Sequence, residues 1–170
     1  ALFHDIGKTS VPGDILRKKG LLTGEEFEEI KVHSEKTREI LEGINWPPVL
    51  CTVPEVAGSH HERWDGSGYP RGMAGEEIPL GARVIAVADA YDALTSRRRY
   101  RKPMAPTAAR GFLAGRSGSH FDPTVIEAFL SRSSAASIYQ TLTRTGSLAG
   151  RLRFPADPGR FRGSGSRRCR

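Results

Sequence analysis

The sequence has few cysteines and no long hydrophobic run, and each shortage excludes a class of protein. Its 170 residues include two cysteines, Cys51 and Cys169, which lie far apart in dissimilar surroundings. This usage excludes a disulfide framework and favours a reducing compartment, so we expect a cytoplasmic location. The longest apolar stretch, residues 84–94, is interrupted by Asp89 and Asp92, whereas a membrane helix needs about 20 apolar residues. No membrane span is predicted.

The C-terminal part of the chain lacks lysine and nearly lacks acids. Residues 131–170 contain nine arginines and one acid, Asp157, so this tail has a charge of +8. The rest of the chain has 17 basic and 18 acidic residues, a charge of −1, so the tail alone makes the total +7. Clustered arginine can bind nucleic acid or anionic membranes without specificity. A composition so poor in apolar residues cannot fold, however, and we prefer to interpret the tail as disordered or read out of frame, with nucleic-acid binding as the alternative.

The length of the remaining chain fits one ordinary domain, which we place at residues 1–130. The first residue is Ala1, with no initiator methionine and no charged-then-apolar targeting pattern. We therefore expect a fragment that begins inside an element, with the N-terminal part of the domain missing.

Apolar residues recur at three- and four-residue spacing, which predicts an all-helical domain. Thr23 with Glu26 three residues later forms a capping box at the start of a long helix. The inward stripe of that helix includes His33. Residues 2–8 are expected to end a buried helix, with Gly7 as its C-terminal stop. Other helices are predicted just after residue 11, from Pro54, and over 82–94, 107–114 and 123–130.

Two consecutive histidines, His60 and His61, precede a loop rich in turn-forming residues. Adjacent side chains do not share one helical stripe, so their use as a pair suggests a common centre, most often a metal. The loop that follows, residues 65–72, carries glycines, Tyr69 and an arginine, and suits the rim of a site for an anionic ligand. The alternative is a surface turn that follows two solvated histidines.

Further polar residues stand in apolar surroundings. The pair His4-Asp5, if buried, needs a partner or a cation, and Lys8 adds a positive group nearby. Asp89 is the better ligand candidate of the two acids in helix 82–94, although pairing with Arg97–Arg99 is an alternative. Residues 97–102 form either a solvated helix end or a phosphate clamp, and His120 is expected to be exposed and without a catalytic role.

Five blocks of residues, in this order and spacing, resemble the HD-GYP family of the HD phosphohydrolase superfamily. They are His4-Asp5-Ile6-Gly7-Lys8, His33, His60-His61-Glu62, Gly68-Tyr69-Pro70, and Asp89 through Leu94-Thr95-Ser96. The resemblance covers about residues 1–130. A single His-Asp pair is weak evidence, whereas five blocks in sequence rarely coincide.

The resemblance implies an HD-domain helical bundle with a short glycine-rich GYP loop that hydrolyses the bacterial messenger cyclic di-GMP. It implies two or three divalent metal ions, iron or manganese, which histidine and carboxylate ligands suit. One ion would be held by His4, Asp5 and Asp89, and Asp5 would bridge to a second ion held by His33, His60 and His61. The implied catalytic residues are Asp5 and Lys8, and the implied nucleotide-binding residues are Tyr69, Arg98 and Arg101.

Some features depart from the family pattern. Ser34 follows His33 where the family commonly has proline, and the histidine that the family supplies from an upstream helix is not in this sequence. Glu62 is the first candidate to replace that ligand. Two alternative functions therefore stay open: a catalytically inactive module that binds nucleotide or a partner, and nonspecific nucleic-acid binding through the tail. A diguanylate cyclase contacting the GYP loop and a second copy of the chain are the expected protein partners.

Overall fold

The computed structural model describes residues 3–97 and 102–131, and within these residues the fold is helical, with no strand. Two isolated β-bridges pair Asp65 with Ala74 and Ser117 with Phe121. The all-α prediction is therefore confirmed. The elements are η1 Ile6–Ser10, α1 Gly13–Arg17, α2 Gly24–Glu42, η2 Pro48–Leu50, α3 Val53–Gly58, η3 Gly75–Glu77, α4 Leu80–Thr95, α5 Pro106–Ala114 and α6 Pro123–Ser131.

The longest helix, α2, begins as its capping box predicts. The amide of Glu26 donates to Thr23 Oγ1 at 3.2 Å, and the amide of Thr23 donates to Glu26 Oε2 at 2.7 Å, which satisfies two amides at the helix start. The buried residues of α2 are His33, Ser34, Thr37 and Leu41, so the predicted inward stripe is confirmed from His33 onward. Because this face is packed, His33 is fixed in the interior of the domain.

The N-terminal segment differs from the prediction. Residues 3–5 form a turn and η1 follows, so Gly7 lies inside a 3₁₀-helix and does not end an α-helix. A Cβ added at Gly7 would lie 2.1 Å from the carbonyl oxygen of His33 and 2.6 Å from the amide nitrogen of Thr37. Glycine is needed here because the backbone of η1 touches the backbone of α2. The prediction that Gly7 ends a helix is wrong.

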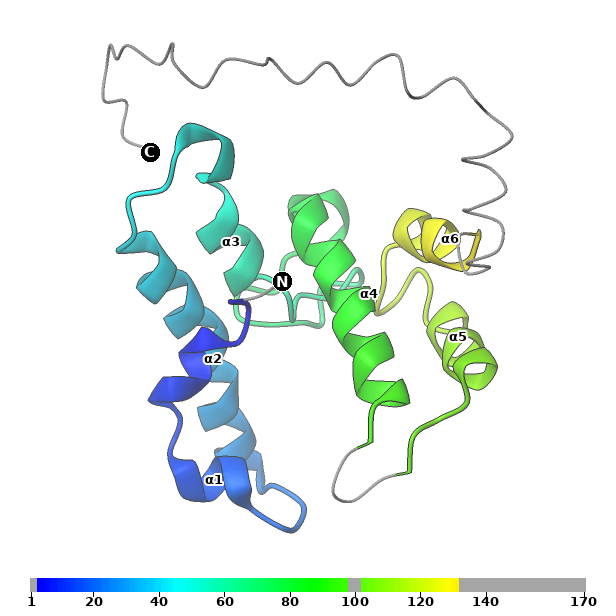
Figure 1. The fold of residues 1–170 in the computed structure, drawn as a ribbon, viewed down its shortest axis with the longest axis horizontal. Helices are drawn as coiled ribbons and strands as arrows, with labels where there is room; N and C mark the ends of the chain where they lie inside the picture. Colours follow the sequence, from blue (N-terminus) through cyan, green and yellow to red (C-terminus); the bar gives the residue numbers. More distant parts are fainter. Residues whose placement is uncertain (1–2, 98–101, 132–170) are drawn as a thin grey trace, which may run out of the picture. The chain divides into compact units, whose positions relative to one another are not determined.

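Helix packing brings the N-terminal and central segments together (Figure 1). Both η1 and α3 pack against α2, and α3 also contacts α4. A hydrophobic core joins α4, α5 and α6 through Val87, Leu94, Ala109, Leu113, Phe121, Val125 and Ile126. The loop between α3 and α4 carries the residues after His61. This arrangement places around one point the turn before η1, helix α2, the residues just after α3 and helix α4, and each of these contributes a histidine or an aspartate.

The turn before α6 supports the loop that follows α3. Trp64 donates its amide to the carbonyl oxygen of His120 at 3.2 Å, and Asp65 donates to Ser119 at 2.8 Å. His120 was expected to be exposed, but it is half-buried, and burial together with nearby Arg63 lowers its pKa. The expectation was wrong because turn residues can serve as a packing partner for another loop.

Residues 1–2, 98–101 and 132–170 lie outside the described residues. Arg98 and Arg101, which the resemblance implies as nucleotide-binding residues, are among them, and so is the predicted tail after its first residue. Of the described helices, none has the length and apolarity that crossing a membrane requires.

Candidate metal centre

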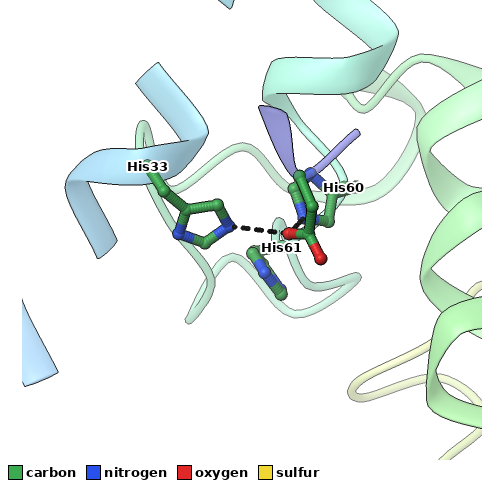
Figure 2. A group of neighbouring side chains, drawn as sticks. His33, His60 and His61 are labelled. Carbon is green, nitrogen blue, oxygen red and sulfur yellow. Dashed lines mark ion pairs between the residues drawn. The ribbon is translucent and has the colours of Figure 1, made fainter. Parts of the chain in front are cut away.

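Three imidazole rings from two helices and the loop after them converge on a single carboxylate (Figure 2). His33 comes from α2, and His60 and His61 follow the C-terminus of α3. One ligand atom from each of these rings and from Asp5 lie within 4.8 Å of one another. These are the four residues that the resemblance assigned to one metal ion.

The two most buried rings are oriented by backbone carbonyl groups. Nδ1 of His33 lies 2.5 Å from the carbonyl oxygen of Ile30, and Nδ1 of His60 lies 2.6 Å from that of Ala57. A carbonyl oxygen only accepts, so each Nδ1 donates the hydrogen bond and each Nε2 is left facing Asp5. Both Nε2 atoms are buried without a hydrogen-bond partner. Buried ring nitrogens oriented in this way are the arrangement that metal-ligating histidines need.

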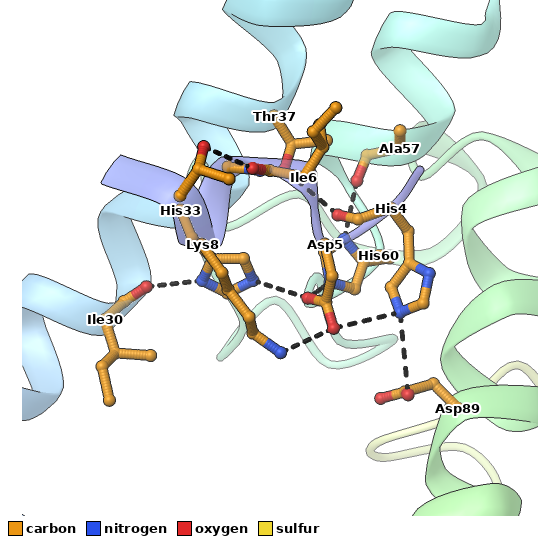
Figure 3. A network of polar contacts seen from close by, with 12 residues as sticks. His4, Asp5, Ile6, Lys8, Ile30, His33, Thr37, Ala57, His60 and Asp89 are labelled. Carbon is orange, nitrogen blue, oxygen red and sulfur yellow. Dashed lines mark hydrogen bonds and ion pairs between the residues drawn. The ribbon is translucent and has the colours of Figure 1, made fainter. Parts of the chain in front are cut away.

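The carboxylate of Asp5 lies between two sets of groups (Figure 3). Its Oδ1 is 3.4 Å from Nε2 of His33 and 3.7 Å from Nε2 of His60, whereas its Oδ2 is 3.5 Å from Nε2 of His4 and 2.6 Å from Nζ of Lys8. Burial alone would raise the pKa of Asp5, but contacts with His33, His60 and Lys8 lower it well below its ordinary value. Asp5 is therefore ionised, with one oxygen directed to each side.

Asp89 lies on the His4 side of this carboxylate. Its Oδ1 is 3.7 Å from Nε2 of His4, and its side chain is 38% exposed, so this side of the site is more open than the His33 side. Asp92, the other acid of α4, is exposed and accepts a hydrogen bond from Ser96 instead. The structure thus brings Asp89 to the cluster and leaves Asp92 outside it.

Electrostatics keep His61 neutral. Burial, together with the nearby His60 and His33, lowers the pKa of His61 to about 2. A neutral imidazole is the form that binds a metal ion. Together with the Nε2 atoms of His33 and His60 and the ionised Asp5, this gives a donor set of three imidazole nitrogens and one carboxylate, which fits a borderline first-row metal.

Tyr69 lies against the cluster and not apart from it. Its ring stacks on that of His61, with centroids 4.8 Å apart and an interplanar angle of 28°. Burial and the charges of Asp5 and Asp89 raise the pKa of Tyr69 to about 12, so the phenol stays protonated. Tyr69 therefore lies beside the cluster. Its contact with His61 was not predicted from the sequence.

Glu62 does not face the cluster as a replacement ligand. Its Oε1 accepts the amide of Arg71 at 2.8 Å, and its Oε2 accepts the amide of Met73 at 3.1 Å. Both oxygens are therefore engaged by the backbone of the following loop. The suggestion that Glu62 completes the first metal site is wrong, because its carboxylate is already used to hold that loop.

Sequence reasoning also missed the role of Thr37. Its hydroxyl accepts the amide of Gly7 at 2.9 Å and donates to the carbonyl oxygen of His4 at 3.1 Å, so it positions the backbone on both sides of Asp5. The available signal was a threonine on the inward stripe, one turn after His33. A buried hydroxyl requires a partner, and the partner is the segment that carries the ligands.

An apolar cavity of about 270 Å³ adjoins His4. It is lined by Phe3, His4, Trp46, Thr52, Val53, Val56, Ala57 and Ile85. Of the residues in the polar cluster, His4 alone lines it, so the cavity lies beside the site and does not contain it.

The chain was compared with protein families, curated proteins and solved structures. A model described as an HD domain matches residues 1–125 of the chain. A solved structure, described as the crystal structure of a cyclic GMP-AMP specific phosphodiesterase of Vibrio cholerae, resembles the fold with a TM-score of 0.55 and 19% sequence identity. The likeness covers 84% of this chain and 41% of that one, and at this identity it supports the fold alone.

Curated relatives share more of the sequence. A probable cyclic di-GMP phosphodiesterase of Vibrio cholerae serotype O1 is 47% identical over 135 residues, which is 76% of this chain and 31% of the relative. A cyclic di-GMP phosphodiesterase of Thermotoga maritima is 48% identical over 130 residues, which is 76% of this chain and 35% of the relative. The chain spans about a third of the length of these relatives.

Proposed function

Because the chain belongs to the HD domain family, as its motifs predicted, we propose that it hydrolyses a phosphodiester bond of cyclic di-GMP with the aid of divalent metal ions. The observation that carries the proposal is the convergence of Asp5, His33, His60 and His61 at one point, with ligand atoms within 4.8 Å of one another. The names of the two curated relatives supply the substrate. Within bacterial signalling this assigns the domain to the removal of a second messenger.

HD domains bind divalent metals, and we propose iron or manganese here. Neutral imidazole and carboxylate are ligands that these borderline ions accept. The His33 side of Asp5 offers three imidazoles, and the other side offers His4 and Asp89. Since each oxygen of Asp5 faces a different set, Asp5 is suited to hold two ions at once.

Asp5 and Lys8 have different proposed roles in the reaction. When bound, the ions supply positive charge that lowers the pKa of a water molecule and offsets the charge on a phosphate group. Asp5 lies between the two sides of the site, and the rings of His4, His33 and His60 surround its two oxygens. Lys8, with Nζ 2.6 Å from Asp5 Oδ2, holds a positive charge at the edge of the centre, where a phosphate oxygen would bind.

Other parts of the proposal rest on the sequence. Arg98 and Arg101 are proposed to bind the phosphate or guanine groups, and Tyr69 is proposed to contact the nucleotide. A diguanylate cyclase at the GYP loop, a second copy of the chain and a cytoplasmic location all stay predictions.

A turnover assay tests the proposal. The protein is loaded with Mn²⁺ or, without oxygen, with Fe²⁺, and its metal content is measured before incubation with cyclic di-GMP or with 3′3′-cGAMP, the substrate named for another group of relatives. Liquid chromatography separates linear dinucleotide from mononucleotide. We expect cyclic di-GMP to be consumed faster.

Matched lysine variants localise the activity. Lys8→Met should lower kcat about 100-fold, because a charge near the reacting phosphate is lost. Lys36→Met removes a lysine that pairs with Glu39 on the surface of α2, and it should leave kcat unchanged. A fully metal-loaded protein that forms no product from either nucleotide would contradict the proposal. Nucleotide binding by calorimetry in that protein would then favour the inactive binding module.

A further inference from the structure

Glu62 is a buried carboxylate that contacts backbone and no metal-ligating side chain. It is 3% exposed, although it directly follows two histidines of the metal centre. Its two oxygens accept the amides of Arg71 and Met73, nine and eleven residues further along the chain. A buried carboxylate that accepts two amides is a strong anchor, because the bonds are charge-assisted and the loop has few other ways to satisfy those amides.

The loop is closed around this anchor by further contacts. The amide of Tyr69 donates to the carbonyl oxygen of His61 at 3.2 Å. At Gly68 an added Cβ would lie 2.3 Å from the amide nitrogen of Arg63 and 2.6 Å from Cα of Glu62, so only glycine permits this approach. The loop therefore folds back on the residues that carry His61 and Glu62.

The side chain of Arg71 fastens the far end of the loop to α3. It donates to Ser59 Oγ at 2.9 Å and forms an ion pair with Glu55. Since Ser59 immediately precedes His60, the loop is joined to the chain on both sides of the histidine pair. The segment from 59 to 73 is thus a closed unit, with Glu62 at its buried centre.

His61 depends on this unit more than the other two histidines do. His33 and His60 are each oriented by a hydrogen bond from Nδ1 to a backbone carbonyl oxygen, whereas the His61 ring has no such bond among the residues that the structure describes. Its ring instead stacks on Tyr69. The Tyr69 ring in turn contacts Phe27 and Lys31. The centroids of the Tyr69 and Phe27 rings are 6.4 Å apart, and Nζ of Lys31 lies 5.6 Å from the centroid of the Tyr69 ring.

We propose that Glu62 is a positioning residue for the metal centre, which sets the orientation of His61 by holding the loop that places Tyr69 against its ring. Glu62 touches neither the ion nor the substrate in this role. The proposal rests on the proposed metal function of His61, and it assigns the loop to ligand orientation besides any contact with nucleotide. Residues that orient metal ligands typically change metal affinity by about 10- to 100-fold when they are replaced.

The first experiment compares two glutamates of the connection between α3 and α4, Glu62 and Glu77. Glutamine at position 62 keeps the shape but has a single acceptor oxygen, so one loop amide faces an NH₂ group. Glu77 also accepts a loop amide, from Ala74 at 3.2 Å, but it is exposed. In Mn²⁺ titrations of the full chain by calorimetry, Glu62→Gln should weaken the affinity about 10- to 100-fold, and Glu77→Gln should not.

Exchange of the Arg71 and Met73 amides with deuterium distinguishes positioning from ligation. In a positioning role, Glu62→Gln keeps the number of ions at saturation but loses protection of at least one of these amides. If the number of bound ions falls while the amides stay protected, Glu62 is a ligand and the proposal is wrong. Mn²⁺ affinity equal to that of Glu77→Gln would also overturn it.

A second pair of variants keeps the proposal testable if Glu62→Gln fails to fold. Tyr69→Phe preserves the stacked ring and should bind Mn²⁺ as tightly as the unmodified protein. Tyr69→Leu removes the ring and should weaken Mn²⁺ binding about 10-fold or more, with helical content unchanged by circular dichroism. Equal affinities for the two variants would contradict positioning through the ring. Because no nucleotide is present, this result is independent of whether the domain hydrolyses cyclic di-GMP.

Discussion

The hydroxyl of Thr37 accepts the backbone amide of Gly7 at 2.9 Å. The same hydroxyl donates to the carbonyl oxygen of His4, at 3.1 Å, so a single side chain of α2 holds the backbone on either side of Asp5. Gly7 permits this contact because it has no Cβ. The position of Asp5 beside His33 is therefore a consequence of how closely η1 approaches α2.

Replacement of Gly7 by alanine should destabilise the domain. The added Cβ would meet the carbonyl oxygen of His33 and the amide of Thr37, which are backbone atoms of a packed helix and cannot move aside. Overpacking of this kind costs about 1–3 kcal/mol, and the displaced η1 should also weaken metal binding. Urea unfolding with and without metal measures both effects.

The control for this variant is Gly111→Ala in α5, where an added Cβ meets nothing within 4 Å. Alanine at this exposed helix position should raise the free energy of unfolding by about 0.5–1 kcal/mol. A Gly7→Ala protein as stable as the unmodified one would show that η1 can move away from α2 at little cost.

The sequence was sufficient for the long helices and for the residues that meet at the centre. Apolar spacing with the Thr23 capping box located α2, and near-uniform apolarity located α4. The resemblance to the HD-GYP family also implied that Asp5 lies with His33 and His61, and the structure brings these residues together.

Contacts between distant segments were not predictable in the same way. From the sequence, Gly7 was interpreted as the stop of a helix. A glycine in a sequence does not show which neighbouring segment leaves no room for a side chain, and here that segment is α2. Glu62 looked like a spare ligand, because a carboxylate next to histidines has the chemistry of one. Its true partners are amides of a loop whose fold no local rule specifies. Packing decides both cases.

The ion pair between Arg83 and Asp122 should make the domain sensitive to acid. Nη1 of Arg83 lies 2.6 Å from Oδ2 of Asp122, which is 1% exposed. Burial would raise the pKa of Asp122, but hydrogen bonds from Thr124 and Arg83 lower it below its ordinary value of 3.8. The stabilisation is therefore present above about pH 4 and is lost as the pH falls further.

Asp122→Asn should cost about 1.5–3 kcal/mol at pH 7, because it removes the charged partner of the half-buried Arg83 guanidinium. Part of the loss of stability below pH 4 should disappear with it. Asp65→Asn is the control: this aspartate accepts comparable bonds from Ser67 but is exposed, and its replacement should cost much less. Equal losses in thermal unfolding at pH 7 would show that the buried pair contributes nothing beyond an ordinary turn.

Removal of residues 131–170 should remove the positive charge of the chain without changing its metal site. The tail holds a charge of +8, and the rest of the chain holds −1. A chain ending at Leu130 should keep its helical signal and metal content but lose any salt-dependent affinity for DNA of unrelated sequence. Fluorescence anisotropy at several salt concentrations measures that affinity. A drop in metal content on truncation would contradict the assignment of the site to residues 1–130.

Asp5→Ala should remove more metal than any other single substitution in the cluster. The two oxygens of Asp5 face different sides, with Oδ1 near His33 and His60 and Oδ2 near His4. A carboxylate shared by two ions holds both, whereas a histidine at one side holds a single ion. The metal content of purified protein, measured by plasma mass spectrometry, should therefore fall further in Asp5→Ala than in His61→Ala.

The matched control for Asp5→Ala is Asp92→Ala. Asp92 is an aspartate of α4 that is exposed and bonded to Ser96, so its loss should leave the metal content unchanged. If Asp5→Ala loses only as much metal as His61→Ala, then Asp5 serves one ion and the division of its two oxygens has another cause. In that case Lys8, which lies 2.6 Å from Oδ2, would be the partner that sets the orientation of the carboxylate. Lys8→Met would then alter metal content, which a bridging Asp5 does not require.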